Sequence, residues 1–334
     1  MKIEKHLTAA DQQLIEEKLR DFVPLRVFDA HAHPVHGDHF AANPHPLVAP
    51  GEVLNLRDHR AALSRWLPAQ QIDGLFFGFP RPGNDRRAIN EWLAQEIKSC
   101  GSPNSRALAL VAPQDDAAQV AEQIEQLGLV GIKPYHVYAD RPDTMNATLE
   151  EFAPEWMWEL CHARQAVLML HIVRERAIAD ADNQAVLHRL CRKYPNCRVV
   201  LAHVARSFNY RHAAEGLSSI RDLENVWIDT SAVTEMPAFR KAIEILGPRR
   251  VLFGTDYPVS EFRGKCTSVG DSFCWLYADS LAPGSIPPGG QATLVGIESL
   301  LCLREACEDC GLGQSDIQEI FHDNAIRLLA PHLS

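Results

Sequence analysis

The sequence lacks several features that would assign it to a large protein class at once. None of its apolar runs approaches the roughly 20 residues that a membrane-spanning helix needs. Residues 1–6 lack the apolar segment of a signal peptide. The 33 basic residues are outnumbered by 43 acidic ones, and the net charge of −10 disfavours nucleic acid or an anionic membrane as a partner. We therefore expect a cytoplasmic protein that binds neither nucleic acid nor membranes.

A disulfide framework is also missing. The nine cysteines are odd in number and have no regular spacing, which suits reduced thiols in a cytoplasm. Cys302, Cys307 and Cys310 lie close together near the end of the chain, but no nearby ligand set completes a zinc site. We expect these three cysteines to be core or helix-face residues.

What the sequence does contain is a regular alternation of strand-like and helix-like segments. The predicted strands span residues 27–33, 72–79, 106–112, 130–133, 166–172, 198–203, 226–229 and 250–254. The predicted helices span residues 8–21, 59–67, 85–99, 117–127, 150–165, 177–194, 211–223, 236–246, 297–309 and 314–329. Residues 34–58 and 260–291 are rich in turn-forming residues and are expected to be long loops.

This alternation implies a parallel sheet with short crossovers, and its repeat suits a closed barrel better than an open doubly wound sheet. No Gly-x-Gly-x-x-Gly follows the first strand, so the main signal of a dinucleotide-binding fold is absent. The 334 residues are enough for one large barrel. We predict a single-domain α/β protein over residues 1–334, a (β/α)₈ TIM barrel. An N-terminal helix, long loops after strands one and eight, and extra C-terminal helices complete it.

The first predicted strand ends in a His-x-His motif. Alternate residues of a strand share one face, so Asp29, His31 and His33 should point the same way. Two imidazoles at this spacing can bind one cation, with Asp29 as support. A cluster of surface histidines is the alternative, because three more histidines follow in the next loop.

Several other predicted strands end in residues that bind metals or anions. They are Lys133, His171, His203 and Asp256. The active site of a TIM barrel lies at the C-terminal ends of its strands, and a polar side chain buried there without a partner would be costly. Strand eight pairs with strand one when a barrel closes, which would bring Asp256 beside the His-x-His motif. The sequence therefore predicts one shared metal site.

These segments resemble the amidohydrolase superfamily, specifically its amidohydrolase-related branch of metal-dependent hydrolases and non-oxidative decarboxylases. The similarity covers nearly the whole chain. The matching segments are Asp29-Ala30-His31-Ala32-His33-Pro34, His171, Leu201-Ala202-His203, Phe253-Gly254-Thr255-Asp256-Tyr257-Pro258 and Asn324-Ala325-Ile326-Arg327-Leu328-Leu329. The resemblance implies that His31, His33, His171 and Asp256 bind one divalent cation. Zinc is the first choice and manganese the alternative.

The resemblance also implies a division of labour. A divalent cation lowers the pKa of a bound water from about 15.7 to about 7. Asp256 would take the proton of that water and pass it to a leaving group. His203 would face the substrate and stabilise an oxyanion or donate a proton, and the alternative is that it only orients a ligand.

Five residues are candidates for binding the substrate: Lys133, Tyr135, His136, Arg81 and Arg206. A guanidinium or an ammonium group suits a substrate carboxylate. A structural ion pair is an equally weighted reading of Lys133, and solvent exposure is the alternative for the arginines. In other branches of the superfamily a carboxylated lysine at the fourth strand bridges two metals, but the branch resembled here usually holds one.

The expected activity is hydrolysis of a lactone or amide bond in a small, carboxylated molecule by a metal-activated water. The alternatives are non-oxidative decarboxylation of an aromatic or unsaturated acid and a non-catalytic metal-binding barrel. The substrate, the number of metal ions and the oligomeric state are left open, with a homo-oligomer as one option.

Overall fold

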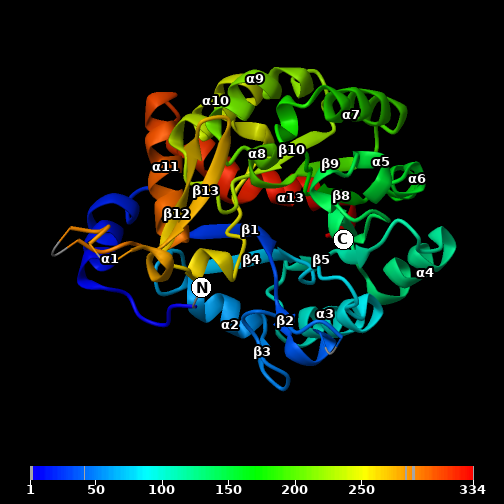
Figure 1. The fold of residues 1–334 in the computed structure, drawn as a ribbon, viewed down its shortest axis with the longest axis horizontal. Coiled ribbons are helices and arrows are strands. Elements are labelled where there is room, and N and C mark those ends of the chain that lie inside the picture. The colour runs from blue at the N-terminus through cyan, green and yellow to red at the C-terminus, as the bar shows by residue number, and fades with distance from the viewer. Residues whose placement is uncertain (1–2, 41, 283, 288–289, 334) are drawn as a thin grey trace.

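The computed structural model describes residues 3–40, 42–282, 284–287 and 290–333, and its centre is built from parallel strands (Figure 1). In chain order these strands are β1 (Arg26–Ala32), β4 (Gln71–Phe76), β5 (Arg106–Ala107), β6 (Ala109–Val111), β7 (Gly131–Pro134), β8 (Val167–Leu170), β9 (Arg198–Leu201), β10 (Val226–Asp229) and β11 (Val251–Leu252). They form one sheet in the order β1-β4-β5 and another in the order β6-β7-β8-β9-β10-β11. Each predicted strand is present, in the predicted order.

Hydrogen bonds join the two sheets into a closed barrel. β5 and β6 are halves of one strand interrupted at Leu108, whose N–H donates to the carbonyl of Phe76 (2.9 Å). On the opposite side, the N–H of Ala30 donates to the carbonyl of Phe253 (2.8 Å). The N–H of His33 donates to the carbonyl of Tyr257 (2.7 Å). The chain beyond β11 therefore pairs with β1, as the sequence predicted.

Helices surround the strands in Figure 1. They are α1 (Ala9–Leu14), α2 (Leu56–Leu63), α3 (Arg86–Cys100), α4 (Ala117–Leu127), α5 (Leu149–Phe152), α6 (Glu155–Arg164), α7 (Ala181–Lys193), α8 (Ala202–Arg206), α9 (Tyr210–Gly216), α10 (Met236–Leu246), α11 (Val295–Asp309), α12 (Gln314–Gln318) and α13 (Asn324–Leu329). The prediction of one helix over 150–165 was wrong, because Pro154 cannot donate a backbone hydrogen bond and separates α5 from α6. No helix in the described part of the chain is both long and apolar enough to cross a membrane.

The two predicted loops each contain an antiparallel pair of strands. β2 (Val35–His36) pairs with β3 (Val53–Leu54), and β12 (Gly264–Val269) pairs with β13 (Ser272–Tyr277). The prediction of irregular chain over 34–58 and 260–291 was therefore wrong for these parts. Positions 41, 283, 288 and 289 of the predicted loops lie outside the described residues.

The core fills the barrel at the N-terminal end of its strands. Phe28, Leu75 and Val167 from the barrel interior form one buried cluster with Leu328 and Leu329 of α13. A larger cluster lies between the strands and the surrounding helices. On α11, Cys307 is buried and Cys302 is half-buried, and Cys310 is half-buried at the C-cap of this helix, which confirms their assignment to the core and a helix face. The packed end leaves the C-terminal end of the strands for the polar residues.

The N-terminal helix is capped as predicted and is fastened to the rest of the protein by one carboxylate. The N–H of Asp11 donates to Oγ1 of Thr8 (3.1 Å), and the N–H of Thr8 donates to the Asp11 carboxylate (2.8 Å). That carboxylate is fully buried and also accepts from Nη2 of Arg263 (2.8 Å) and Oγ1 of Thr293 (2.5 Å). After α1 the chain continues as a π-helical turn, Ile15–Leu19.

Asp11→Ala should lower the free energy of unfolding by about 3 kcal/mol at pH 7, because the N–H of Thr8 loses its acceptor in the capping box and Arg263 loses its partner. Urea denaturation followed by circular dichroism measures this change. Burial raises the pKa of Asp11, but its hydrogen bonds outweigh that effect and leave the pKa below its ordinary value. The stabilisation is therefore present above about pH 4 and is lost as the pH falls through the folded-state pKa.

Asp21→Ala is the matched control, because Asp21 is exposed in the same segment and its loss should change stability by less than about 0.5 kcal/mol. Equal stability of the Asp11 and Asp21 variants at pH 7 would contradict this account of Asp11. So would a gap between wild type and Asp11→Ala that widens below pH 4.

Candidate active site

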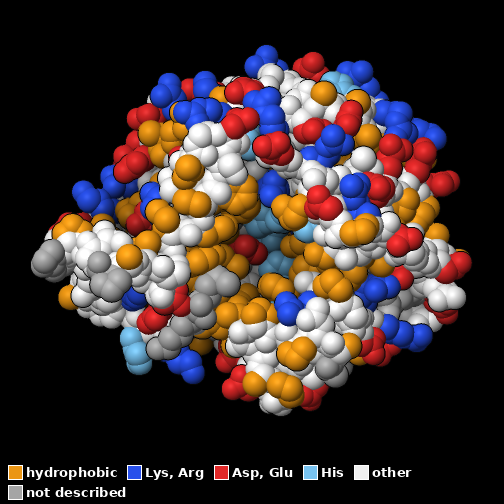
Figure 2. Space-filling model, viewed as in Figure 1, with side chains coloured by type: hydrophobic (Ala, Val, Ile, Leu, Met, Phe, Trp, Pro, Cys, Tyr) orange, Lys and Arg blue, Asp and Glu red, His pale blue; other side chains and the backbone are white. Residues whose placement is uncertain are grey.

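The C-terminal ends of the strands surround a hollow. Figure 2 shows histidine and acidic side chains at its floor and hydrophobic side chains around its rim. His31 belongs to β1 and His33 follows it, His171 follows β8, His203 follows β9, and Asp256 follows β11. The prediction that these five residues gather at one end of the barrel agrees with the structure.

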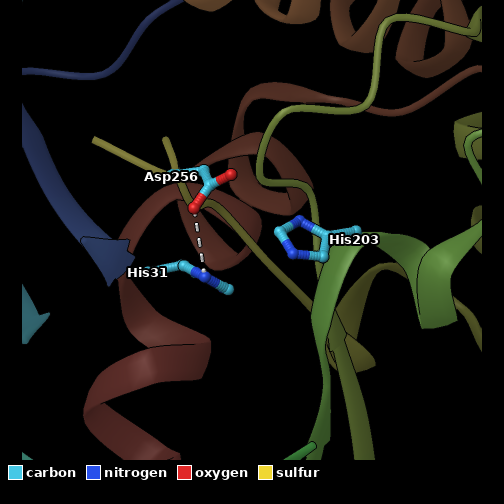
Figure 3. Close-up of side chains that lie close together, drawn as sticks. All are labelled: His31, His203 and Asp256. Carbon is cyan, nitrogen blue, oxygen red and sulfur yellow. Dashed lines mark ion pairs between the residues drawn. The ribbon is translucent and has the colours of Figure 1, made fainter. Parts of the chain in front are cut away.

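Three of these residues form the tightest group. One ligand atom each from His31, His203 and Asp256 lies within 4.8 Å of the other two (Figure 3). Oδ1 of Asp256 is 3.4 Å from Nε2 of His31 and 3.4 Å from Nε2 of His33. In a tetrahedral zinc site with bonds of about 2.1 Å, two ligand atoms are also about 3.4 Å apart.

The Nδ1 atoms of the same histidines each face a carboxylate or carbonyl oxygen; Nδ1 of His203 also lies 2.9 Å from Oγ of Ser231, whose hydroxyl donates to Asp229. Nδ1 of His31 is 2.9 Å from Oδ2 of Asp229, and Nδ1 of His33 is 3.2 Å from the carbonyl of Gly78. Nδ1 of His203 is 2.9 Å from the carbonyl of Ser231. Each Nδ1 therefore carries the proton, and each Nε2 presents a lone pair.

These Nε2 lone pairs converge on an ionised carboxylate. Burial lowers the pKa of His33, and it lowers the pKa of His203 to about 4. Burial raises the pKa of Asp256, but the surrounding imidazoles more than offset this and leave it below its ordinary value. Nε2 of His31 is buried and has no hydrogen-bond partner in the described part of the chain. Lone pairs facing one another without a proton between them repel, so the group fits a divalent cation.

His203 and His171 are in contact. Nε2 of His203 is 3.2 Å from Nδ1 of His171, whose ring stacks on Tyr135 with centroids 5.5 Å apart. The sequence assigned His33 and His171 to the metal and His203 to catalysis. The structure brings all of them together, and one ligand atom of His203 lies within 4.8 Å of one from His31 and one from Asp256.

Asp229 is the main residue that the sequence analysis missed. Its buried carboxylate pairs with His31 and also accepts from the N–H groups of His203 (2.9 Å) and Ser231 (3.1 Å). Burial raises the pKa of Asp229, but the charge and hydrogen bond of His31 hold it well below its ordinary value. The signal was present, because Asp229 ends the seventh predicted strand as His203 ends the sixth.

Asp29 supports the site from behind, as expected. Its buried carboxylate accepts from the N–H of His31 (3.1 Å), from the N–H and hydroxyl of Thr255 (2.9 and 2.5 Å), and from Nε2 of His59 (2.8 Å). These bonds hold β1 against the residue that precedes Asp256.

The chain after β9 adopts a strained conformation. The strand ends at Leu201, and the residues of α8 that follow have positive φ angles of 59°, 51°, 54° and 56° from His203 to Arg206. The predicted strand end at His203 was therefore wrong by two residues. Left-handed backbone costs about 1–2 kcal/mol per non-glycine residue. Such strain is typical of functional sites, where the surroundings impose it.

Lys133 lies at the floor of the barrel without an ion pair. It is fully buried, and its Nζ has no hydrogen-bond partner among the described residues. Nζ is 4.9 Å from the ring centroid of Phe77 and 4.8 Å from that of Tyr135. Burial lowers the pKa of Lys133 to about 7. The structural ion pair considered for Lys133 is absent from the described residues.

The remaining substrate-binding candidates lie farther out. Nδ1 of His136 is 3.1 Å from the carbonyl of Thr144, and its ring is 5.8 Å from that of His171. Arg206 is buried beside the site, whereas half-buried Arg81 donates from Nε to the carbonyl of Asn43 (2.9 Å) in the first loop. Their roles in substrate binding stay predictions.

Solved structures with the same fold include hydrolases and a decarboxylase. A protein from Pseudomonas putida, provisionally named 2-pyrone-4,6-dicarboxylic acid hydrolase, is 18% identical over 92% of this chain and 98% of its own (TM-score 0.56). A zinc-bound amidohydrolase from Burkholderia multivorans is 16% identical over 91% and 99% (TM-score 0.57). A 2,6-dihydroxybenzoate decarboxylase bound to 2,6-dihydroxybenzoate is 16% identical over 92% and 99% (TM-score 0.53). At these identities the similarity shows a shared fold.

A comparison with curated proteins found no match. The family model described as amidohydrolase matches residues 28–330, which include every residue of the site. The chain therefore belongs to the amidohydrolase 2 family.

Proposed function

We propose that the protein is a metal-dependent hydrolase that opens a lactone or amide bond in a small, carboxylated substrate. The observation that carries this proposal is the convergence of the Nε2 lone pairs of His31, His33 and His203 on the Asp256 carboxylate. Membership of an enzyme family whose shared fold includes hydrolases supports it.

In this proposal His31, His33, His171 and Asp256 hold one divalent cation, zinc or alternatively manganese. His203 is the alternative to His171, because its Nε2 lies closer to His31 and Asp256. The cation would supply a water of lowered pKa and a polarised substrate oxygen. Asp229 and the carbonyl of Gly78 keep His31 and His33 in the tautomer that binds a metal.

The chain's own residues then move the proton. Asp256 accepts a proton from the attacking water and returns it to the leaving group. Its position is held by its N–H, which donates to the carbonyl of His31 (2.8 Å). His203 is neutral at pH 7 and has its proton on Nδ1, so its Nε2 suits accepting a hydrogen bond from the water better than donating one to an oxyanion.

Non-oxidative decarboxylation of an aromatic or unsaturated acid is the second candidate. The observation that favours it is Lys133, an amine that is partly protonated near pH 7 and lies between the rings of Phe77 and Tyr135. These surroundings suit a flat acid, and the protonated amine could supply the proton that carbon needs after carbon dioxide leaves. Products separate the two reactions: ¹⁸O from water enters the product of hydrolysis, whereas decarboxylation releases carbon dioxide without it.

Removing the metal should abolish activity. Protein dialysed against a chelator should lose its activity on a panel of lactones and amides and regain it with one equivalent of zinc or manganese. Elemental analysis of the protein as purified should find about one divalent ion per chain. Full activity in metal-free protein would contradict the proposal.

Asp256→Asn should lower kcat by about 10²–10⁴-fold, because an amide cannot accept the proton of the attacking water. Steady-state kinetics together with elemental analysis separates this loss of chemistry from loss of metal. The matched control is Asp140→Asn, since Asp140 is an exposed carboxylate that makes no contact with the site. Unchanged kcat in the Asp256 variant would exclude Asp256 as the base.

A further inference from the structure

The hairpin β12–β13 lies on one side of the barrel (Figure 1), and hydrophobic side chains border the hollow (Figure 2). Phe273, Trp275 and Tyr277 alternate along β13, so their side chains share one face, and all three are half-buried. The rings of Trp275 and Tyr277 are stacked, with centroids 5.4 Å apart and an interplanar angle of 5°. The ring of Phe208 packs against Phe273 (5.1 Å) and Trp275 (5.5 Å).

This row joins two parts of the site. At one end the guanidinium carbon of Arg206 lies 5.3 Å from the ring centroid of Phe273. In the middle, Phe208 is 5.2 Å from the ring of His203. At the other end the ring of Tyr277 packs against that of Phe262, with centroids 5.7 Å apart. We call Phe273, Trp275 and Tyr277 the aromatic wall.

Arg206 is a buried cation without a carboxylate partner among the described residues. Its side chain is 6% exposed, and its Nη1 donates to the carbonyl of Arg174 (3.1 Å). Within the described part of the chain the other N–H groups of the guanidinium donate no hydrogen bond, so they are free to bind an anion.

The hairpin is held in place from two directions. Nδ2 of Asn209 donates to the carbonyls of Gly270 (3.1 Å) and Ser272 (2.7 Å) at its turn. Oγ1 of Thr234 donates to the carbonyl of Cys266 (2.6 Å) and accepts from its N–H (2.9 Å) at its base. The wall is therefore a fixed surface, with the guanidinium of Arg206 at its Phe273 end.

We infer that the aromatic wall and Arg206 form a binding subsite for a flat, ring-bearing carboxylate. Trp275 and Tyr277 contact the face of the ring, and Arg206 binds the acidic group with the paired N–H donors of its guanidinium. Phe273 is a positioning residue that keeps the guanidinium flat against the wall. The inference rests on the proposed function only for the location of the reacting bond beside Asp256.

Three simple probes test this subsite without any need for turnover. Benzoate is flat and charged, cyclohexanecarboxylate is charged but not flat, and benzamide is flat but neutral. Each is titrated by ligand-observed NMR into zinc-saturated protein and into metal-free protein. The second series removes direct binding of a carboxylate to the metal. Wild-type protein should bind benzoate more tightly than either of the other two in both forms.

Arg206→Met should weaken benzoate binding by about tenfold or more, which is the usual contribution of a charge-assisted hydrogen-bonded pair. The same variant should leave the affinity for benzamide unchanged. Trp275→Ala should reduce the preference for benzoate over cyclohexanecarboxylate. Phe273→Leu should weaken benzoate binding several-fold, and Phe273→Tyr should bind benzoate as tightly as wild type. Arg211→Met is the matched control and should bind like wild type, because Arg211 is an exposed arginine whose Nη1 reaches the same hairpin at Gly270.

Equal benzoate affinity in the Arg206 and Arg211 variants would overturn the inference, provided that thermal melting shows both to be folded. Equal affinity of wild-type protein for benzoate and benzamide would also overturn the inference, because the aromatic wall would then bind the ring by packing alone. Benzoate binding that depends on Arg206, in a protein that hydrolyses nothing, would reject the proposed function and keep the subsite. Hydrolysis of lactones by a protein whose benzoate binding does not depend on Arg206 would reject the subsite and keep the proposed function.

Discussion

The Nε2 atoms of His31, His33 and His203 all face one carboxylate because their Nδ1 protons are committed elsewhere. A carboxylate and two carbonyls accept those protons, and the Ser231 hydroxyl, which also lies at Nδ1 of His203, donates its own proton to Asp229. Asp229 has the central part, since it fixes the tautomer of His31 and also accepts from the backbone of His203. The tautomers of the site histidines are thus set by hydrogen bonds to groups that lie behind them.

The rest of the barrel maintains this arrangement at a cost in local energy. The left-handed run from His203 to Arg206 is unfavourable for side chains that include a β-branched valine. Buried Lys133, whose Nζ has no hydrogen-bond partner among the residues that the structure describes, adds a second unfavourable feature close by. Two large apolar clusters offset these terms. The energetically unfavourable local features therefore concentrate at the site, where they hold side chains in orientations that an unstrained backbone would not give them.

The sequence predicted the barrel because its buried strands are continuous apolar runs, and it predicted the site because polar residues end those runs. Asp229 follows the same rule and was overlooked at the seventh strand. The hairpin β12–β13 was also readable, since Gly270-Asp271 is a two-residue turn and aromatic residues alternate after it. The left-handed run was not readable. Positive φ is normally signalled by glycine or asparagine, and neither is present from His203 to Arg206. Only tertiary contacts impose it.

Closure of the barrel between β11 and β1 also has a consequence for biosynthesis. The hydrogen bonds from Thr255 to Asp29 join residues 226 positions apart, and ribosomes take about 11–45 s to add that many residues at about 5–20 per second. During this time β1 has left the ribosome with its histidines but without the strand that closes the barrel. The group of His31, His203 and Asp256 is thus the last part of the barrel to assemble. A nascent chain that stalls before β11 would present two histidines and an open sheet edge, a target for chaperones.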